Sequence, residues 1–155
     1  MEEKILISLD GSKTGETALP YVKELVAKLS PEVKVEITLL QVVSPMSHYV
    51  VAGEESVQIA YTEQEMEQIK SKARDYLSRV GESLRSSGAT AEIKVGVGDA
   101  ADEIIKTADE INVDIIAMST HGRSGLSRWA FGSVTDKVLR GGNRPVLVVR
   151  APRQA

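Results

Sequence analysis

A polar, glycine-rich segment at residues 119–133 has the composition best suited to holding an anion. Its sequence, STHGRSGLSRWAFGS, contains three glycines, four serines and two arginines. Glycine lets the backbone approach an anion closely, and N–H groups that converge at a helix start bind phosphate. An apolar run precedes the segment and a short helical pattern follows it. We interpret it as a phosphate-holding loop, with a plain turn and helix cap as the alternative.

Several side chains of this segment have more than one interpretation. Ser133 begins the predicted helix, and its hydroxyl either only caps that helix, with Asp136 as capping-box partner, or also donates to a phosphate. Arg123 and Arg128 add charge if they face the ligand, although exposure to solvent is the more common state of arginine. We interpret His121 as a locally packed or hydrogen-bonded residue and not as a general base.

Asp10 is a second residue whose side chain could bind a ligand. It ends an apolar run and opens the glycine-containing turn DGSKTG. A carboxylate at such a position contacts a ribose hydroxyl or a magnesium ion beside phosphates. The same carboxylate can instead close an Asx-turn or cap the next helix. Both roles are open from the sequence alone.

The elements that must position these residues alternate between strands and helices. Apolar runs predict strands at 4–9, 33–43, 91–97, 113–119 and 144–150. Helical periodicity predicts helices at 17–29, 62–86, 99–113 and 133–140, the second opened by a Thr62–Glu65 capping box and ended by Gly88. Residues 44–61 show no clear period and are predicted to form a long loop with at most one helical turn.

This alternation predicts an α/β fold, with residues 1–155 as one domain. The expected architecture is Rossmann-like, an open five-stranded parallel sheet with helices on both faces. Ligands of such sheets bind outside the carboxyl ends of the strands, where the strand order reverses. The dinucleotide-like spacing of GVGDAA (96–101) falls at the third strand, so we interpret Gly98-Asp99 as a turn and helix start.

Composition excludes several other classes of function. The chain has no cysteine and only two histidines, which excludes thiolate and histidine-rich metal sites. A net charge of −3 argues against a general nucleic-acid binder. The acidic start MEEKILISL differs from a signal peptide, and no apolar run has the length of a membrane span. We expect a cytoplasmic protein without a nucleic-acid or membrane partner.

Three stretches together resemble the universal stress protein family. They are SLDGS near the start, LLQVVSP after the second strand, and STHGRSGLSRWAFGSVTDKVLR with RPVLVVR at the end. The resemblance runs from Ile5 to Arg150. The nucleotide pattern of the family, G-2x-G-9x-G-[S/T], is present as Gly122, Gly132 and Ser133, while Ser119 replaces its first glycine.

The resemblance implies the strand order 3-2-1-4-5, with ATP near the switch point. It places Asp10 beside the ribose and phosphates, with Mg²⁺ as a further expectation, and the backbone of Val42 against the adenine. It also implies a homodimer in which strand 146–150 pairs with its twin. The residues expected to bind the nucleotide are Ser8, Leu9, Asp10, Val42, Met118, Ser119, His121, Gly122, Arg123, Gly132, Ser133 and Val134.

The function implied is that of a cytoplasmic, adenine-nucleotide-binding universal stress protein. It would act in the stress response as a nucleotide-dependent binding switch toward an unidentified protein partner, with little or no hydrolysis and no catalytic residue. The alternative is a dimeric scaffold that binds no nucleotide and works through protein contacts. A slow ATP hydrolase using magnesium on Asp10 is a third hypothesis. Ser119 either crowds the nucleotide or adds a hydroxyl contact to it.

Overall fold

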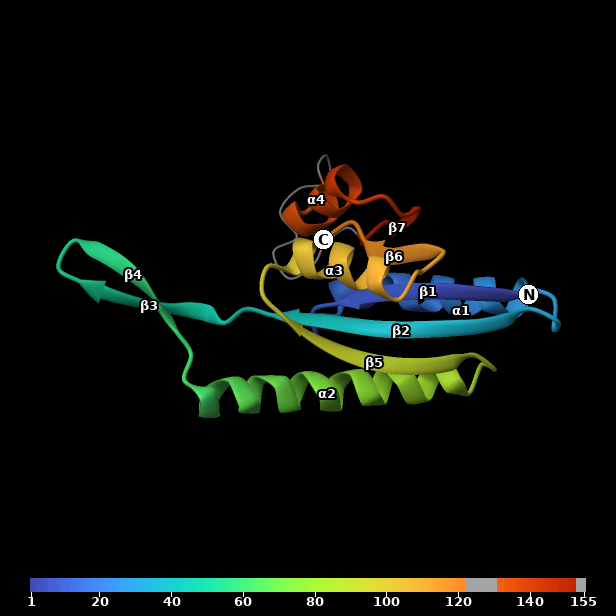
Figure 1. The fold of residues 1–155 in the computed structure, drawn as a ribbon, viewed down its shortest axis with the longest axis horizontal. Coiled ribbons are helices and arrows are strands. Elements are labelled where there is room, and N and C mark those ends of the chain that lie inside the picture. The colour runs from blue at the N-terminus through green and yellow to red at the C-terminus, as the bar shows by residue number, and fades with distance from the viewer. Residues whose placement is uncertain (122–130, 153–155) are drawn as a thin grey trace.

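The computed structural model describes residues 1–121 and 131–152, with the side chains of 47–52 excepted. Its elements follow the predicted alternation, with one insertion between the second strand and the second long helix (Figure 1). In chain order they are β1 (Glu2–Leu9), η1 (Thr14–Thr17), α1 (Ala18–Lys28), β2 (Lys34–Val43), β3 (Met46–Ala52), β4 (Glu55–Ala60), α2 (Glu63–Arg85), β5 (Thr90–Val97), α3 (Ala100–Glu110), β6 (Ile115–Ser119), α4 (Ser133–Gly141) and β7 (Val146–Val149).

The main sheet of the described residues has five strands in the order β5-β2-β1-β6-β7, and every neighbouring pair is parallel. The predicted α/β class and parallel sheet are therefore confirmed. The order is the predicted 3-2-1-4-5 when only the strands of this sheet are counted. The labels differ in detail because β3 and β4 form a separate two-stranded sheet.

β1 lies at the centre of the sheet and is buried on both faces. Ile5, Leu6 and Ile7 are each at most 1% exposed, although successive side chains of a strand point in opposite directions. Ile5 and Ile7 pack into the cluster formed with α1 and α2, and Leu6 packs into the cluster formed with α3 and α4. Helices therefore cover both faces of the sheet, as a continuous apolar strand requires.

The predicted cap of the long helix is present. The Thr62 hydroxyl accepts from the Glu65 N–H at 3.2 Å, and the Glu65 carboxylate accepts from the Thr62 N–H at 3.1 Å. The chain leaves this helix through Gly88, whose φ of +96° is a conformation that favours glycine. None of the helices in the described ranges is long and apolar enough to cross a membrane.

The prediction of a loop at 44–61 is wrong. β3 and β4 pair as an antiparallel hairpin that projects from one end of the molecule in Figure 1. The hairpin turns at Gly53 and Glu54, and Gly53 has φ of +72°, which suits a two-residue hairpin turn. A register shift between Met46 and His48 interrupts the two-residue alternation that reveals a strand in a sequence.

The capping box generates a test of stability. Thr62→Ala removes the hydroxyl that satisfies a first-turn N–H group, so we expect unfolding free energy to fall by about 1 kcal/mol. Thr62→Ser keeps a hydroxyl at the same position and should stay near the native value. Urea denaturation of the three proteins measures both effects. A Thr62→Ala variant as stable as the native protein would show that the capping hydroxyl contributes nothing.

Candidate functional site

A cavity of about 270 Å³ lies at the carboxyl ends of β1, β2 and β6, beside the starts of α3 and α4. Ten of the twelve predicted site residues line it, which brings together positions more than a hundred residues apart. Gly122 and Arg123, together with Arg128, lie outside the described residues. The ten are Ser8, Leu9, Asp10, Val42, Met118, Ser119, His121, Gly132, Ser133 and Val134.

The cavity is also lined by three residues that the sequence analysis missed: Gly15, Ala100 and Thr135. Gly15 belongs to the turn that Asp10 opens, and Thr135 follows the predicted motif by two residues, so their positions gave a local signal. Ala100 is the first residue of α3. It lies inside the GVGDAA stretch (96–101), whose glycine spacing was a weak signal that we interpreted as a turn and helix start.

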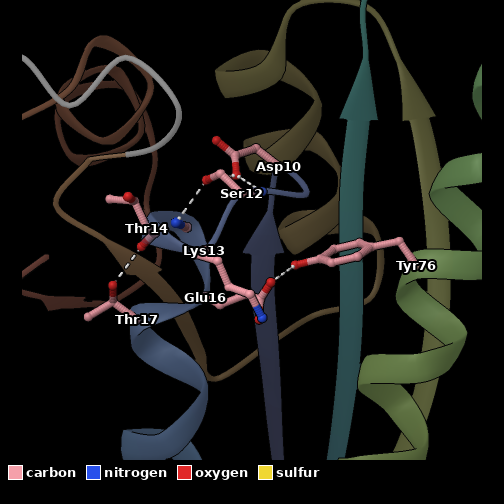
Figure 2. A network of polar contacts seen from close by, with 8 residues as sticks. Asp10, Ser12, Lys13, Thr14, Glu16, Thr17 and Tyr76 are labelled. Atoms are coloured by element: carbon pink, nitrogen blue, oxygen red, sulfur yellow. Dashed lines mark hydrogen bonds and ion pairs between the residues drawn. The ribbon is translucent and has the colours of Figure 1, made fainter.

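The turn after β1 is held by the Asp10 side chain. Asp10 Oδ1 accepts from the Ser12 N–H at 2.9 Å and from the Ser12 hydroxyl at 2.5 Å. The Ser12 Oγ in turn accepts from the Gly15 N–H at 3.0 Å, and Figure 2 shows this relay from the carboxylate to the backbone. The Asx-turn interpretation of Asp10 is therefore confirmed, and the same carboxylate also lines the cavity.

Gly15 leaves room for that carboxylate. A Cβ atom built on Gly15 would overlap Asp10 Oδ1, and it would also lie 3.1 Å from the Ser12 hydroxyl. Gly15 is buried in the 3₁₀ turn η1. The position therefore requires glycine for reasons of space.

Hydrogen bonds tie the end of β6 to the start of α4 across the segment that is not described. The Gly132 N–H donates to the Thr120 carbonyl at 2.8 Å, and the Thr135 hydroxyl donates to the Ser119 carbonyl at 2.9 Å. The Ser119 hydroxyl donates to the His121 carbonyl, so its proton is already used by the main chain. These contacts fix the first turn of α4 against the cavity.

The predicted capping box of Ser133 with Asp136 is wrong. Gly132 is the N-cap, with φ of −60° and ψ of 158°, and no side chain caps this helix. Ser133 is already the first helical residue, so its hydroxyl lies one position too late to cap, and Asp136 instead pairs with Arg140 at 2.9 Å. The N–H groups at a helix start have no partner within the helix. Ser133, Val134 and Thr135, the first three residues of this helix, line the cavity.

The predicted turn at Gly98-Asp99 is confirmed. Gly98 has φ of +139°, and Asp99 caps α3 by accepting from the Asp102 N–H at 3.0 Å. This hydrogen bond, followed by that from the Lys137 ammonium, lowers the pKa of Asp99 from its usual value. His121 Nδ1 lies 3.1 Å from the Thr120 hydroxyl, which agrees with a locally hydrogen-bonded side chain.

The match to known proteins decides the family. The sequence model described as the Universal stress protein family matches residues 1–150. The chain belongs to this family. It is 31% identical over 159 residues to universal stress protein MJ0577 of Methanocaldococcus jannaschii, covering 97% of this chain and 96% of that protein.

Solved structures of universal stress proteins share the fold. The structure of MJ0577 superposes with a TM-score of 0.75 and 28% identity, covering 98% of both chains. A universal stress protein of Arabidopsis thaliana with AMP bound has a TM-score of 0.64 and 16% identity, with 97% and 92% covered. One from Archaeoglobus fulgidus in complex with dAMP has a TM-score of 0.62 and 20% identity, with 96% and 98% covered.

A second hollow of about 630 Å³ in this universal stress protein shares Asp10 and Val42 with the first. It reaches Ser44 and Tyr61, where the hairpin leaves the body of the molecule. The side-chain oxygen of Gln41 is buried here and has no hydrogen-bond partner among the described residues. The cavity therefore continues toward the base of the hairpin.

The crowding at Gly15 generates a paired prediction. Gly15→Ala forces the Asp10 carboxylate to move, and we expect a loss of about 1–3 kcal/mol of unfolding free energy. Gly81→Ala, within α2, meets only ordinary contacts at 3.6 Å and should raise stability by about 0.5–1 kcal/mol. Urea denaturation measures both. A stabilised Gly15→Ala variant would show that the turn has room to spare.

Proposed function

We propose that this universal stress protein binds an adenine nucleotide in the 270 Å³ cavity, with ATP and Mg²⁺ as its working ligand. The observation that carries the proposal is that the first turn of α4 lines the cavity together with Asp10, on the turn after β1. A helix start is a ready anion site, because its amides and its dipole both favour negative charge. The cavity also lies where ligands of open α/β sheets bind.

Each part of a nucleotide has a chemically suitable wall. The phosphates fit the amides of Ser133, Val134 and Thr135. The adenine fits beside Val42 and Met118, two apolar residues that line the cavity. Asp10 faces the ribose and the metal ion. Mg²⁺ needs only one or two protein carboxylates when phosphates complete its shell, so one aspartate is sufficient.

Relatives support the class of ligand. The universal stress proteins of Arabidopsis thaliana and Archaeoglobus fulgidus are described with AMP and dAMP. Both ligands are adenine nucleotides, which an adenine wall joined to a phosphate wall recognises. We extend this class to the present chain on the geometry of its own cavity.

The protein acts as a binding switch and not as an efficient hydrolase. Asp10 is the single carboxylate that lines the described cavity, and it is engaged by Ser12, so it is poorly placed to activate water. Nucleotide binding changes the surface beside the cavity that a protein partner recognises. We propose that the protein acts in the cytoplasm, in the stress response. It forms a homodimer through residues 146–150, because β7 is an edge strand of the described sheet with one unpaired side.

Filling the cavity should remove binding. Ala100→Leu places three extra carbons at the cavity wall without touching a polar group, so we expect affinity for ATP and AMP to fall by about tenfold or more. Isothermal titration of nucleotide-free protein measures the affinity. Ala27→Leu, an exposed position of α1, is the matched control and should bind as the native protein does.

The same titration separates the two main hypotheses. If native protein binds no adenine nucleotide and carries none after purification, the nucleotide function fails and the scaffold interpretation stands. If Ala100→Leu loses binding while its oligomeric state and unfolding midpoint stay native, the scaffold-only interpretation fails.

The Asp10 charge has its own test. Asp10→Asn keeps an oxygen for the two hydrogen bonds from Ser12 but removes the negative charge. We expect Mg²⁺ to strengthen ATP binding by the native protein and not by the variant, with metal-free AMP binding little changed. Titrations with and without Mg²⁺ measure the difference. An equal Mg²⁺ effect in both proteins would place the metal away from Asp10.

A further inference from the structure

The β3–β4 hairpin exposes apolar side chains without a cover. Every residue of β4 is exposed, and Val57 and Ile59, two positions apart on one face, are 49% and 45% exposed. Among the described elements, β3 and β4 make their substantial contacts only with each other. An isolated two-stranded hairpin is marginally stable in water. This one therefore needs a surface to pack against.

A groove of about 860 Å³ between α1 and α2 has the complementary character. Leu19 and Leu84 are buried in its floor, and Val80 is half-buried beside them. The groove is lined by three cationic side chains, those of Lys13, Lys23 and Arg79. It thus combines an apolar floor with a basic rim.

The one carboxylate lining this groove is already paired. Glu16 accepts from the Tyr76 hydroxyl at 2.9 Å and lies 3.8 Å from the Lys13 ammonium, as Figure 2 shows. Burial, followed by the hydrogen bond to Glu16, raises the pKa of Tyr76, so the phenol remains a donor at neutral pH. The groove therefore presents excess positive charge to a segment that binds in it.

The hairpin carries the opposite charge. Glu54 and Glu55 stand at its turn, and the sequence has no lysine or arginine from Ser44 to Thr62. We propose that the hairpin of one copy of this protein binds the groove between α1 and α2 of a second copy. Its acidic turn meets the basic rim, and the face with Val57 and Ile59 packs toward the apolar floor. The contact does not depend on nucleotide binding.

A second copy is favoured over the other occupants. The hairpin extends away from the two helices that form its own groove, so it does not fold back onto them (Figure 1). Two hairpins packed tip to tip would bring four glutamates together without a cation. In a reciprocal exchange, each copy inserts its hairpin into the groove of the other. A single two-fold axis then covers both hairpins and fills both grooves.

Disulfide trapping tests the contact directly, because the native chain has no cysteine. Ser56→Cys places a thiol on β4, and Ser83→Cys places one in the groove; both serines are exposed and both changes preserve charge. The two proteins are mixed under mild oxidation and the covalent heterodimer is followed on non-reducing gels. Ser71→Cys, exposed on α2 but not lining the groove, replaces Ser83→Cys as matched control.

We expect Ser56→Cys to couple with Ser83→Cys at least about tenfold faster than with Ser71→Cys, because docking raises the local thiol concentration. Adding Arg79→Glu to the Ser83→Cys protein should remove this faster coupling, because it reverses a charge on the basic rim. Adding Glu55→Arg to the Ser56→Cys protein as well should restore the faster coupling between the two double variants. Equal rates with both partners would overturn the proposal. Preferential coupling of Ser56→Cys with itself would also overturn it, in favour of contact between hairpins.

Discussion

The whole molecule depends on the position of β1, which pairs on both sides and is buried on both faces. Its parallel register with β2 and β6 aligns the carboxyl ends of all three strands. Because the strands are parallel, the loops after Leu9, Val43 and Ser119 all leave from the same edge of the sheet. The cavity is a consequence of this alignment, since each strand delivers its polar loop to the same point.

Backbone contacts then shape what the alignment brings together. The Asp10 carboxylate holds its own turn through Ser12, and the Thr135 hydroxyl holds the end of β6 through the Ser119 carbonyl. The N–H groups in the first turn of α4 add donors that have no acceptor within the helix. Such donors are rigid, because they belong to a helix that the core already fixes.

The sequence predicted most of the fold because apolar periodicity is strong in its buried elements. Ten residues of the cavity were predicted in two ways. Asp10, Gly132 and Ser133 stood out because loops at strand ends are polar and glycine-rich, whereas apolar positions such as Val42 and Val134 came from the resemblance to the family. The cap of the last helix was misplaced by one residue, at Ser133 instead of Gly132, since a Gly-Ser pair offers two positions for a cap. The hairpin was missed because β4 has no buried face to impose alternation and a register shift interrupts its pairing with β3. Ala100 joins the cavity only through tertiary packing.

The ends of the hairpin meet where it leaves the body, with the Tyr61 N–H donating to the Pro45 carbonyl at 3.0 Å. An insertion closed at its base in this way can change in length or sequence while β2 and α2 keep their places. Evolution can therefore revise the surface that the hairpin presents without disturbing the sheet edge that forms the cavity. The same interior is thus compatible with different exteriors, so the fold and its outer surface can change independently.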